Sequence, residues 1–249
     1  MWHDLGCPAI FLPSLSTPLF HLVFYRLVVG SLRVLLTFGA RVRRVVFHEP
    51  PAGAFVLASN HVSHFDPPIL SGWTRRKIDW IAMSRLFGTG WSNKAFHWLD
   101  VIPVDRGGDD RRPLREALRR LAGGSVIGVF PEGGIRDGER SMLSGAPVQE
   151  GAVMLAVRAG CPIVPVAILG SERLYNAKNW LPWRRARVYI GVGAAIAPPA
   201  GEPSRGAARE RMRAELAAAM IRLKDDLVAR CGLDDRDLPH SPQQRMSEP

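Results

Sequence analysis

Short apolar runs alternate with longer segments of helical pattern along most of this sequence. The runs lie at residues 54–58, 78–83, 101–104, 125–130, 162–168 and 187–192. The clearest helical segments between them are residues 111–122 and 149–159. This alternation is typical of α/β domains. We therefore predict an α/β fold with a mixed, largely parallel sheet flanked by helices, and 249 residues suffice for one sizeable domain.

Residues 18–40 form an apolar segment whose length approaches that of a membrane span. Arg26 and Arg33 interrupt it, and each arginine costs about 2.5–3.5 kcal/mol near a bilayer centre. Together with Gly30 and Thr37 they recur at spacings of three and four, which places them in one stripe of a helix. We predict an amphipathic helix that lies in the membrane interface with its arginines at the headgroups. A helix packed on the protein's own core, with solvated arginines, is the alternative.

Breaks in composition divide the chain into four parts. Pro and Gly residues at 198–201 form a linker, and residues 207–230 have the pattern of a charged helix. The final residues carry few apolar side chains, which favours disorder. The predicted parts are an N-terminal membrane-associated segment (1–44), a central domain (45–200), a C-terminal helix (201–232) and a disordered tail (233–249).

The sequence is strongly basic, with 33 Lys and Arg against 23 Asp and Glu and a formal net charge of +10. This excess predicts an anionic partner, and we expect phospholipid rather than nucleic acid because no nucleic-acid-binding module is recognisable. Residues 41–44 carry three arginines, and residues 180–185 join two tryptophans to two more, as membrane anchors do. The three cysteines form no CxxC pair, and the N-terminus lacks a basic export signal. We expect a monotopic or peripheral protein on the cytoplasmic face of the cell membrane.

The candidate chemistry begins where the run 54–58 ends, at Asn60 and His61. Open α/β sheets build their sites at strand ends, and a histidine there can take a proton near neutral pH. Asp66 stands five residues later, where its carboxylate can fold back to fix the histidine tautomer. A metal site is a weaker alternative because no HExxH or CxxC accompanies the pair. A structural histidine that caps a helix beginning near Pro67 is the other alternative.

Two further strand ends place residues of the same kind. Glu132 and Gly133 follow the run 125–130, and the glycine allows a ligand to approach the backbone closely. Arg106 follows the run 101–104, and its guanidinium suits a phosphate or carboxylate. Arg136 can serve the same purpose. Three strand ends that each deliver a reactive or anion-binding residue indicate a site rather than a purely structural histidine.

Four blocks of this sequence resemble, in order, the glycerolipid acyltransferase family, typified by bacterial 1-acyl-sn-glycerol-3-phosphate (lysophosphatidic acid) acyltransferase. The first is Asn60-His61-Val62-Ser63-His64-Phe65-Asp66, which matches the family's NHxxxxD block. The others are Ile102-Pro103-Val104-Asp105-Arg106, Phe130-Pro131-Glu132-Gly133 and Ile163-Val164-Pro165-Val166-Ala167-Ile168. The resemblance covers roughly residues 45–195. One block alone is a weak signal, and four in register are a strong one.

The resemblance implies transfer of a fatty acyl group from acyl-CoA or acyl carrier protein to the hydroxyl of a lysophospholipid. The expected acceptor is 1-acylglycerol-3-phosphate and the product phosphatidic acid. His61 would act as general base and Asp66 would orient it. The implied substrate-binding residues are Asn60, Arg106, Glu132, Gly133, Arg136 and Pro165. The resemblance implies no cofactor or metal, since the acyl donor is a co-substrate.

The third block departs from the family's usual Gly-Thr-Arg-Ser ending. Here it continues Gly133-Gly134-Ile135-Arg136, so the arginine is displaced by one position and the hydroxyl is lost. The acceptor can therefore be another lysolipid or alcohol. An alternative from a different class is a non-catalytic, basic, peripheral membrane-binding protein, which the charge alone would explain.

Overall fold

A computed structural model describes residues 19–87, 90–105, 111–181, 183–200 and 204–241. Its centre is a seven-stranded sheet in the order β1-β7-β6-β2-β5-β3-β4. The strands are β1 (Ala40–Val46), β2 (Phe55–Ser59), β3 (Ile78–Met83), β4 (Ile102–Val104), β5 (Val126–Val129), β6 (Ile163–Leu169) and β7 (Ala186–Val192). All neighbours pair in parallel except β6 and β7, which are antiparallel. The predicted mixed, largely parallel sheet is therefore confirmed.

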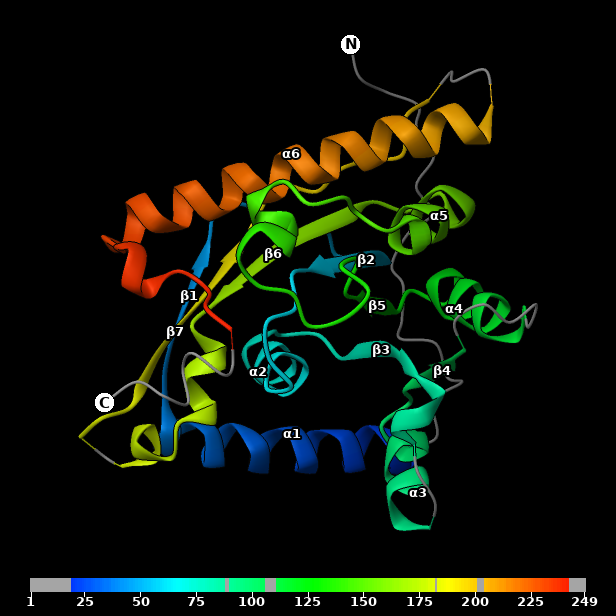
Figure 1. The fold of residues 1–249 in the computed structure, drawn as a ribbon. Coiled ribbons are helices and arrows are strands. Elements are labelled where there is room, and N and C mark those ends of the chain that lie inside the picture. The colour runs from blue at the N-terminus through cyan, green and yellow to red at the C-terminus, as the bar shows by residue number, and fades with distance from the viewer. Residues whose placement is uncertain (1–18, 88–89, 106–110, 182, 201–203, 242–249) are drawn as a thin grey trace.

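Helices cover both faces of this sheet (Figure 1). The helices are α1 (Leu19–Gly39), α2 (Asp66–Trp73), α3 (Trp91–Trp98), α4 (Arg112–Ala122), α5 (Glu150–Ala159) and α6 (Arg205–Cys231). One apolar cluster joins α4, α5 and α6 to one face of the sheet, and a second joins α1 and α2 to the other. The two clusters explain why β2 reads as a continuous apolar run: its side chains alternate between two covered faces.

The C-terminal segment corrects one expectation. We predicted disorder from residue 233, but residues 235–237 form a turn of 3-10 helix whose Asp237 is buried. Arg173, which lies in the 3-10 helix Ser171–Tyr175, donates to the Asp237 carboxylate at 3.1 Å. This long-range ion pair holds residues that local composition marks as disordered. The prediction is therefore wrong for residues 233–241, and the remainder of the predicted tail lies outside the described residues.

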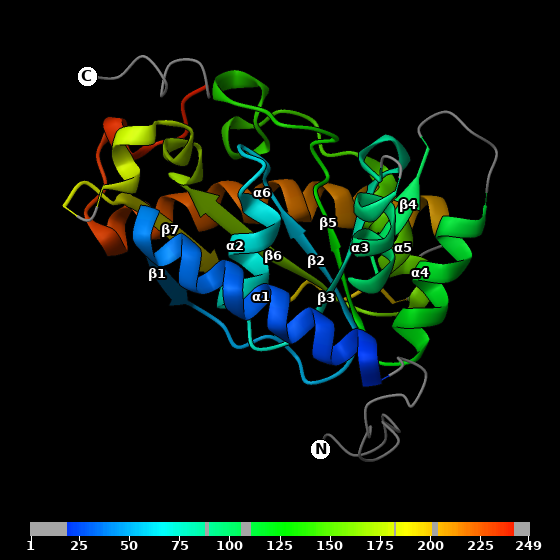
Figure 2. The same cartoon turned by 90° about the horizontal axis from the view of Figure 1, so that it is seen from below.

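Helix α1 lies along the outside of α2 (Figure 2). Its inner side buries Tyr25 and Leu36, whereas Leu27 and Val34 on the opposite side are 66% and 62% exposed. Among the described residues, α1 is the helix that is long and apolar enough to cross a membrane, with a mean hydropathy of 1.7. The predicted helix is confirmed. Its exposed apolar side is what weakly indicates membrane association.

The two predicted tryptophan anchors have different surroundings. Trp180 is half-buried, and its indole Nε1 donates to the carbonyl of Leu174 at 2.9 Å. A Cβ atom on Gly39, the last residue of α1, would lie only 2.8 Å from that indole. Trp183 is 75% exposed and remains free to act as an anchor. Trp180 instead locks the end of α1 against the domain.

Candidate active site

The site begins where β2 ends beside β6. The side-chain amide of Asn60 donates to the carbonyl of Ile168 at 2.9 Å and accepts from its N–H at 2.8 Å. Both polar groups of this buried amide are therefore engaged with the neighbouring strand. The sequence assigned Asn60 to substrate binding, but in the structure it fixes the end of β2, from which His61 emerges.

His61 and Asp66 lie together, as the spacing predicts. The imidazole Nδ1 is 2.9 Å from the Asp66 carboxylate oxygen Oδ2, and the imidazole side chain is 16% exposed while that of Asp66 is fully buried. Asp66 is the first residue of α2, where the helix N-terminus favours a negative charge. A carboxylate at Nδ1 selects the tautomer with its proton on that nitrogen. The other ring nitrogen, Nε2, is thereby left able to accept a proton.

Three additional donors hold the Asp66 carboxylate. The backbone N–H groups of Val62 and Ser63 donate to Oδ2 at 2.8 and 2.9 Å. The hydroxyl of Ser171 donates to Oδ1. Because a fully buried carboxylate is stable only when its oxygens are satisfied, these contacts allow the burial of Asp66 and fix its orientation.

Glu132 follows β5 and reaches the backbone of the same loop. Its Oε2 accepts from the N–H of His61 at 2.6 Å, and its Oε1 accepts from the Ser141 hydroxyl at 2.7 Å and the Met142 N–H at 2.8 Å. Burial raises the pKa of this carboxyl above its ordinary value, although the three hydrogen bonds oppose the shift. Both oxygens of the residue predicted to bind substrate are thus engaged with the protein. They hold the main chain of His61 in place.

A stack of rings supports the imidazole from below the loop. The His61 ring lies on that of Phe130, with centroids 4.1 Å apart and planes at 20°. Phe130 in turn stacks on Trp80 at 4.8 Å, with planes at 4°. The stacked rings pack face to face, which holds the plane of the imidazole in place.

The loop after Glu132 brings Arg136 to the site. The Arg136 N–H donates to the carbonyl of His61 at 2.8 Å, and Gly133 adopts a positive φ of 71° in the turn between them. The Arg136 guanidinium is half-buried and has no hydrogen-bond or ion-pair partner within the part of the chain that the structure describes. Its side chain is therefore available to bind an anion, and its backbone is tied to that of His61.

Two predicted residues remain, Arg106 and Pro165, and the structure describes the second of them. Arg106 lies outside the described residues. Pro165 is buried in β6, paired with Ala58 of β2, and its carbonyl accepts from the Gly193 N–H at 3.0 Å. Pro165 thus lies within the sheet, and the next residue, Val166, pairs with Ser59 at the end of β2. In the described ranges, no three His, Cys, Asp or Glu side chains are grouped closely enough to hold a metal ion.

Sequence reasoning missed Ser171, Ser141 and Tyr175. Ser171 follows β6 directly after Gly170, so it is a polar residue at a strand end, the same signal that identified His61 and Glu132. Ser141 has no such signal, because it lies nine positions after Glu132 and reaches it across the intervening loop. The Tyr175 hydroxyl accepts from the His64 N–H at 3.0 Å, which fixes the exposed middle of the loop.

Known proteins resemble this chain in sequence and in fold. The sequence model of the Acyltransferase family matches residues 43–169, about half of the chain. A 1-acyl-sn-glycerol-3-phosphate acyltransferase of Bacillus subtilis is 27% identical over 203 residues, which cover 81% of this chain and 96% of that protein. The human 1-acyl-sn-glycerol-3-phosphate acyltransferase alpha is 33% identical over 152 residues, 59% of this chain and 52% of that protein. The chain thus spans about half the length of this human relative.

The crystal structure of the 1-acyl-sn-glycerophosphate (LPA) acyltransferase from Thermotoga maritima has the same fold. It matches with a TM-score of 0.56 at 23% identity over 80% of this chain and 81% of that one. The matched family segment runs from β1 to the end of β6 and therefore includes His61, Asp66 and Glu132. From this match, and from the strand-end site that lies within it, we conclude that the chain belongs to the acyltransferase family.

Proposed function

We propose that this enzyme transfers a fatty acyl group from acyl-CoA or acyl carrier protein to the free hydroxyl of 1-acylglycerol-3-phosphate, giving phosphatidic acid. The observation that carries the proposal is the His61–Asp66 pair at the end of β2, with Nδ1 held at 2.9 Å and the ring partly open to solvent. The names of the relatives supply the acceptor, and a net charge of +10 suits a phosphorylated one.

In the proposed step, His61 Nε2 takes the proton of the acceptor hydroxyl as its oxygen attacks the thioester carbonyl carbon. The new C–O bond forms, the C–S bond breaks, and the proton passes from the imidazolium to the leaving thiolate. Asp66 keeps the tautomer and stabilises the charged ring, while the Phe130 face supports it. No covalent intermediate on the protein is required.

We assign the predicted substrate-binding residues to two groups. Arg136, whose backbone N–H contacts His61 and whose guanidinium has no partner among the described residues, would bind the acceptor phosphate, together with Arg106 on the strength of the sequence pattern alone. Asn60, Glu132 and Gly133 would act as positioning residues, because their contacts are with the backbone around His61. Pro165 would shape the packing beneath the site.

Substitution of the histidine tests the proposal. His61→Ala removes the general base, so we expect turnover to fall by about 10²–10⁴-fold, the usual contribution of such a group. The measurement is release of free thiol from acyl-CoA in the presence of 1-acylglycerol-3-phosphate, with phosphatidic acid quantified in the same samples. Asp66→Asn, which disturbs the tautomer, should also lose activity.

His64→Ala is the matched control. His64 lies in the same loop but is exposed and contacts Tyr175 rather than Asp66, so this variant should retain most activity. Unchanged turnover in His61→Ala would overturn the proposed mechanism. Lipid binding without thiol release in the unaltered protein, across a panel of donors and acceptors, would instead favour a non-catalytic membrane-binding protein. Turnover with another lysolipid alone would correct the acceptor.

A further inference from the structure

A basic cavity of about 260 Å³ lies between α1 and the C-terminal end of α2, away from the catalytic pair. Asp66 begins α2, whereas the cavity is lined by the last turn of that helix and the residues after it. At a rise of about 1.5 Å per residue, the eight residues of α2 put the two ends roughly 10 Å apart. Its lining includes Arg26, Arg33, Arg75, Arg76 and Lys77.

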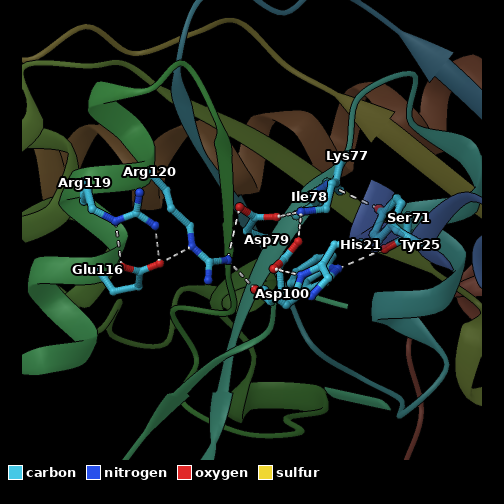
Figure 3. A network of polar contacts seen from close by, with 11 residues as sticks. His21, Tyr25, Ser71, Lys77, Ile78, Asp79, Asp100, Glu116, Arg119 and Arg120 are labelled. Atoms are coloured by element: carbon cyan, nitrogen blue, oxygen red, sulfur yellow. Dashed lines mark hydrogen bonds and ion pairs between the residues drawn. The ribbon is translucent and has the colours of Figure 1, made fainter. Parts of the chain in front are cut away.

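Two of these five cations are occupied by the protein. Arg76 donates to four backbone carbonyls, those of Pro51, Ala52, Gly53 and Gly124. Lys77 forms ion pairs with Asp79 and Asp100, both at 2.6 Å, and lies over the Tyr25 ring (Figure 3). These contacts engage both charges, so neither side chain offers a free charge to a ligand.

The other three cations are not committed. Among the described residues, Arg26 and Arg75 have no hydrogen-bond or ion-pair partner, and Arg33 lies over the Trp73 ring at 5.3 Å without a carboxylate partner. Arg26 and Arg33 belong to α1, and Arg75 lies just after the end of α2. The two helices approach closely, since a Cβ atom on Gly72 would lie 3.4 Å from the Cβ of Arg33. Three guanidinium groups around one cavity create a strongly positive site without a neutralising group of its own.

The cavity opens beside the exposed apolar side of α1. Arg26 immediately precedes Leu27, and Arg33 immediately precedes Val34, so each arginine lies about 100° around the helix from an exposed apolar side chain. A lipid headgroup at the bilayer surface would therefore meet the arginines while the apolar side chains enter the acyl region. Free anions have no comparable reason to gather at this edge.

We propose that this cavity binds the phosphate of an anionic phospholipid of the supporting membrane, at a site distinct from the one that binds the acyl acceptor. The proposal rests on the proposed membrane location of α1 and is independent of acyl transfer. Arg26, Arg33 and Arg75 would donate to the phosphate oxygens, and the planar guanidinium groups suit that geometry. The site would fix the rotation of α1 about its axis on the membrane, which non-specific charge attraction cannot do.

Vesicle binding by the protein of residues 1–249 tests the proposal. The measured quantity is the affinity for phosphatidylcholine vesicles that contain phosphatidylglycerol, divided by the affinity for vesicles of phosphatidylcholine alone. Substitution of all three arginines by Gln should lower this ratio at least about hundredfold, since one charge-assisted hydrogen bond is worth about a factor of ten. The matched control is Gln at three exposed arginines of α6, namely Arg205, Arg222 and Arg230. Helix α6 lies across the sheet from α1 (Figure 1), so these substitutions should change the ratio less than about threefold.

Gly30→Leu distinguishes binding inside the cavity from attraction to a charged surface in general. The leucine side chain would fill the cavity, and every charge would remain. A Cβ atom on Gly30 meets no heavy atom within 4 Å, and Leu is the better helix former, so the variant should fold; thermal unfolding checks this. We expect the ratio to fall about tenfold, the loss of one such contact. An unchanged ratio in folded Gly30→Leu would overturn the proposal.

Competition identifies the source of the phosphate. Short-chain phosphatidylglycerol should displace the protein from vesicles, whereas inorganic phosphate and free CoA at the same concentration should not. Displacement by inorganic phosphate or CoA would show that the cavity takes free anions, and the lipid assignment would be wrong. Acyl transfer is not measured in any of these experiments, so their failure is distinct from failure of the proposed reaction.

Discussion

Asp66 shows how a single buried charge can organise a loop. It accepts from the His61 ring, from two backbone N–H groups and from the Ser171 hydroxyl. The local partners follow from the five-residue spacing, because a loop that folds back over a helix N-terminus presents its N–H groups there. Ser171 comes from 105 residues further along the chain and ties the loop to the end of β6.

Ser171→Ala tests whether this long-range contact positions the catalytic pair. The change leaves a buried carboxylate oxygen without its hydroxyl donor, which we expect to lower the free energy of unfolding by about 1–3 kcal/mol. It should lower kcat several-fold and leave KM for the acyl donor little changed, because the ring is misplaced but the substrate site is intact. Steady-state kinetics and urea denaturation measure the two effects.

Ser204→Ala is the control for this comparison. Its hydroxyl accepts from the Ala207 N–H at the start of α6, so loss of that cap should cost about 1 kcal/mol with kcat unchanged. A kcat for Ser171→Ala equal to that of Ser204→Ala would show that Ser171 is only a stabilising residue.

Glu132 makes a prediction about pH. Burial raises its pKa, so the folded protein binds a proton here over a range in which the unfolded chain has lost it. Stability from this group is complete below the ordinary carboxyl value and declines as pH rises through the raised pKa. In Glu132→Gln this decline should be absent. The free energy of unfolding of the two proteins is measured from acid to neutral pH. The difference between them gives the contribution of Glu132.

The same variant should also lose activity. One amide NH₂ must face a backbone N–H, either that of His61 or that of Met142, so one donor loses its acceptor. Glu139→Gln, at an exposed position in the same loop region, is the control and should match the unaltered protein in both measurements. If Glu132→Gln and Glu139→Gln altered the pH dependence of the free energy of unfolding equally, the assignment of that dependence to Glu132 would be wrong.

Strand ends were the part of the site that the sequence could predict. A buried strand must stop where polar residues begin, so the positions of His61 and Glu132 after β2 and β5 follow from the apolar pattern alone. The orientation of Glu132 toward the backbone could not be predicted, because it depends on where the loop carrying Ser141 and Met142 folds. The contact of Asn60 with β6 could not be predicted for the same reason, because its partner, Ile168, is 108 residues away.

Helix α1 makes a prediction about the membrane. Glu at both Leu27 and Val34 places charge on the exposed apolar side, where it cannot enter the acyl region, so we expect vesicle affinity to fall at least tenfold, as about 1.5–3 kcal/mol is lost per side chain. Stability should change by no more than about 0.5 kcal/mol, since both positions are on the surface. Vesicle sedimentation and thermal unfolding measure the two quantities.

Glu at Ala214 and Ala229 of α6 is the control, because it adds the same charge at exposed positions on the other side of the sheet. Equal vesicle binding by both double variants would contradict a membrane role for α1. Deletion of residues 1–40 is a less clean test, since it also removes the buried Tyr25 and Leu36 and uncovers the apolar cluster beneath them.

Across the molecule, one polar network joins elements that are distant in sequence. Asp100, after α3, contacts His21 of α1 at 2.8 Å and Lys77 at 2.6 Å, and Arg120 of α4 reaches Asp79 of β3 at 3.2 Å (Figure 3). The sequence did not indicate this network, because each charge alone reads as a solvated surface residue. Only the packing of the helices around β3 brings the charges together.

Lys77→Met tests how much the network contributes. It leaves two largely buried carboxylates without their shared cation, so we expect the free energy of unfolding to fall by about 3 kcal/mol at neutral pH. Burial tends to raise the pKa of Asp100, but the hydrogen bonds from Lys77 and His21 outweigh it and lower the pKa below its ordinary value. The network's stabilisation is therefore present above that value and lost as pH falls through the lowered pKa.

The difference between Lys77→Met and the unaltered protein should accordingly shrink in acid, which urea denaturation at several pH values can follow. Lys94→Met, at an exposed lysine of α3, is the control and should change stability by no more than about 0.5 kcal/mol. A loss in Lys77→Met that stays constant down to strongly acidic pH would contradict the ionic origin of the effect.

The junction between α1 and β1 has a mechanical consequence. The helix ends at Gly39, the strand begins at Ala40, and the indole of Trp180 fills the space beside the joint. With no hinge there, an anchored α1 would hold the whole sheet at one height and tilt above the bilayer. The enzyme would then select lipids by how far their hydroxyl extends from the membrane surface, independently of the headgroup charge.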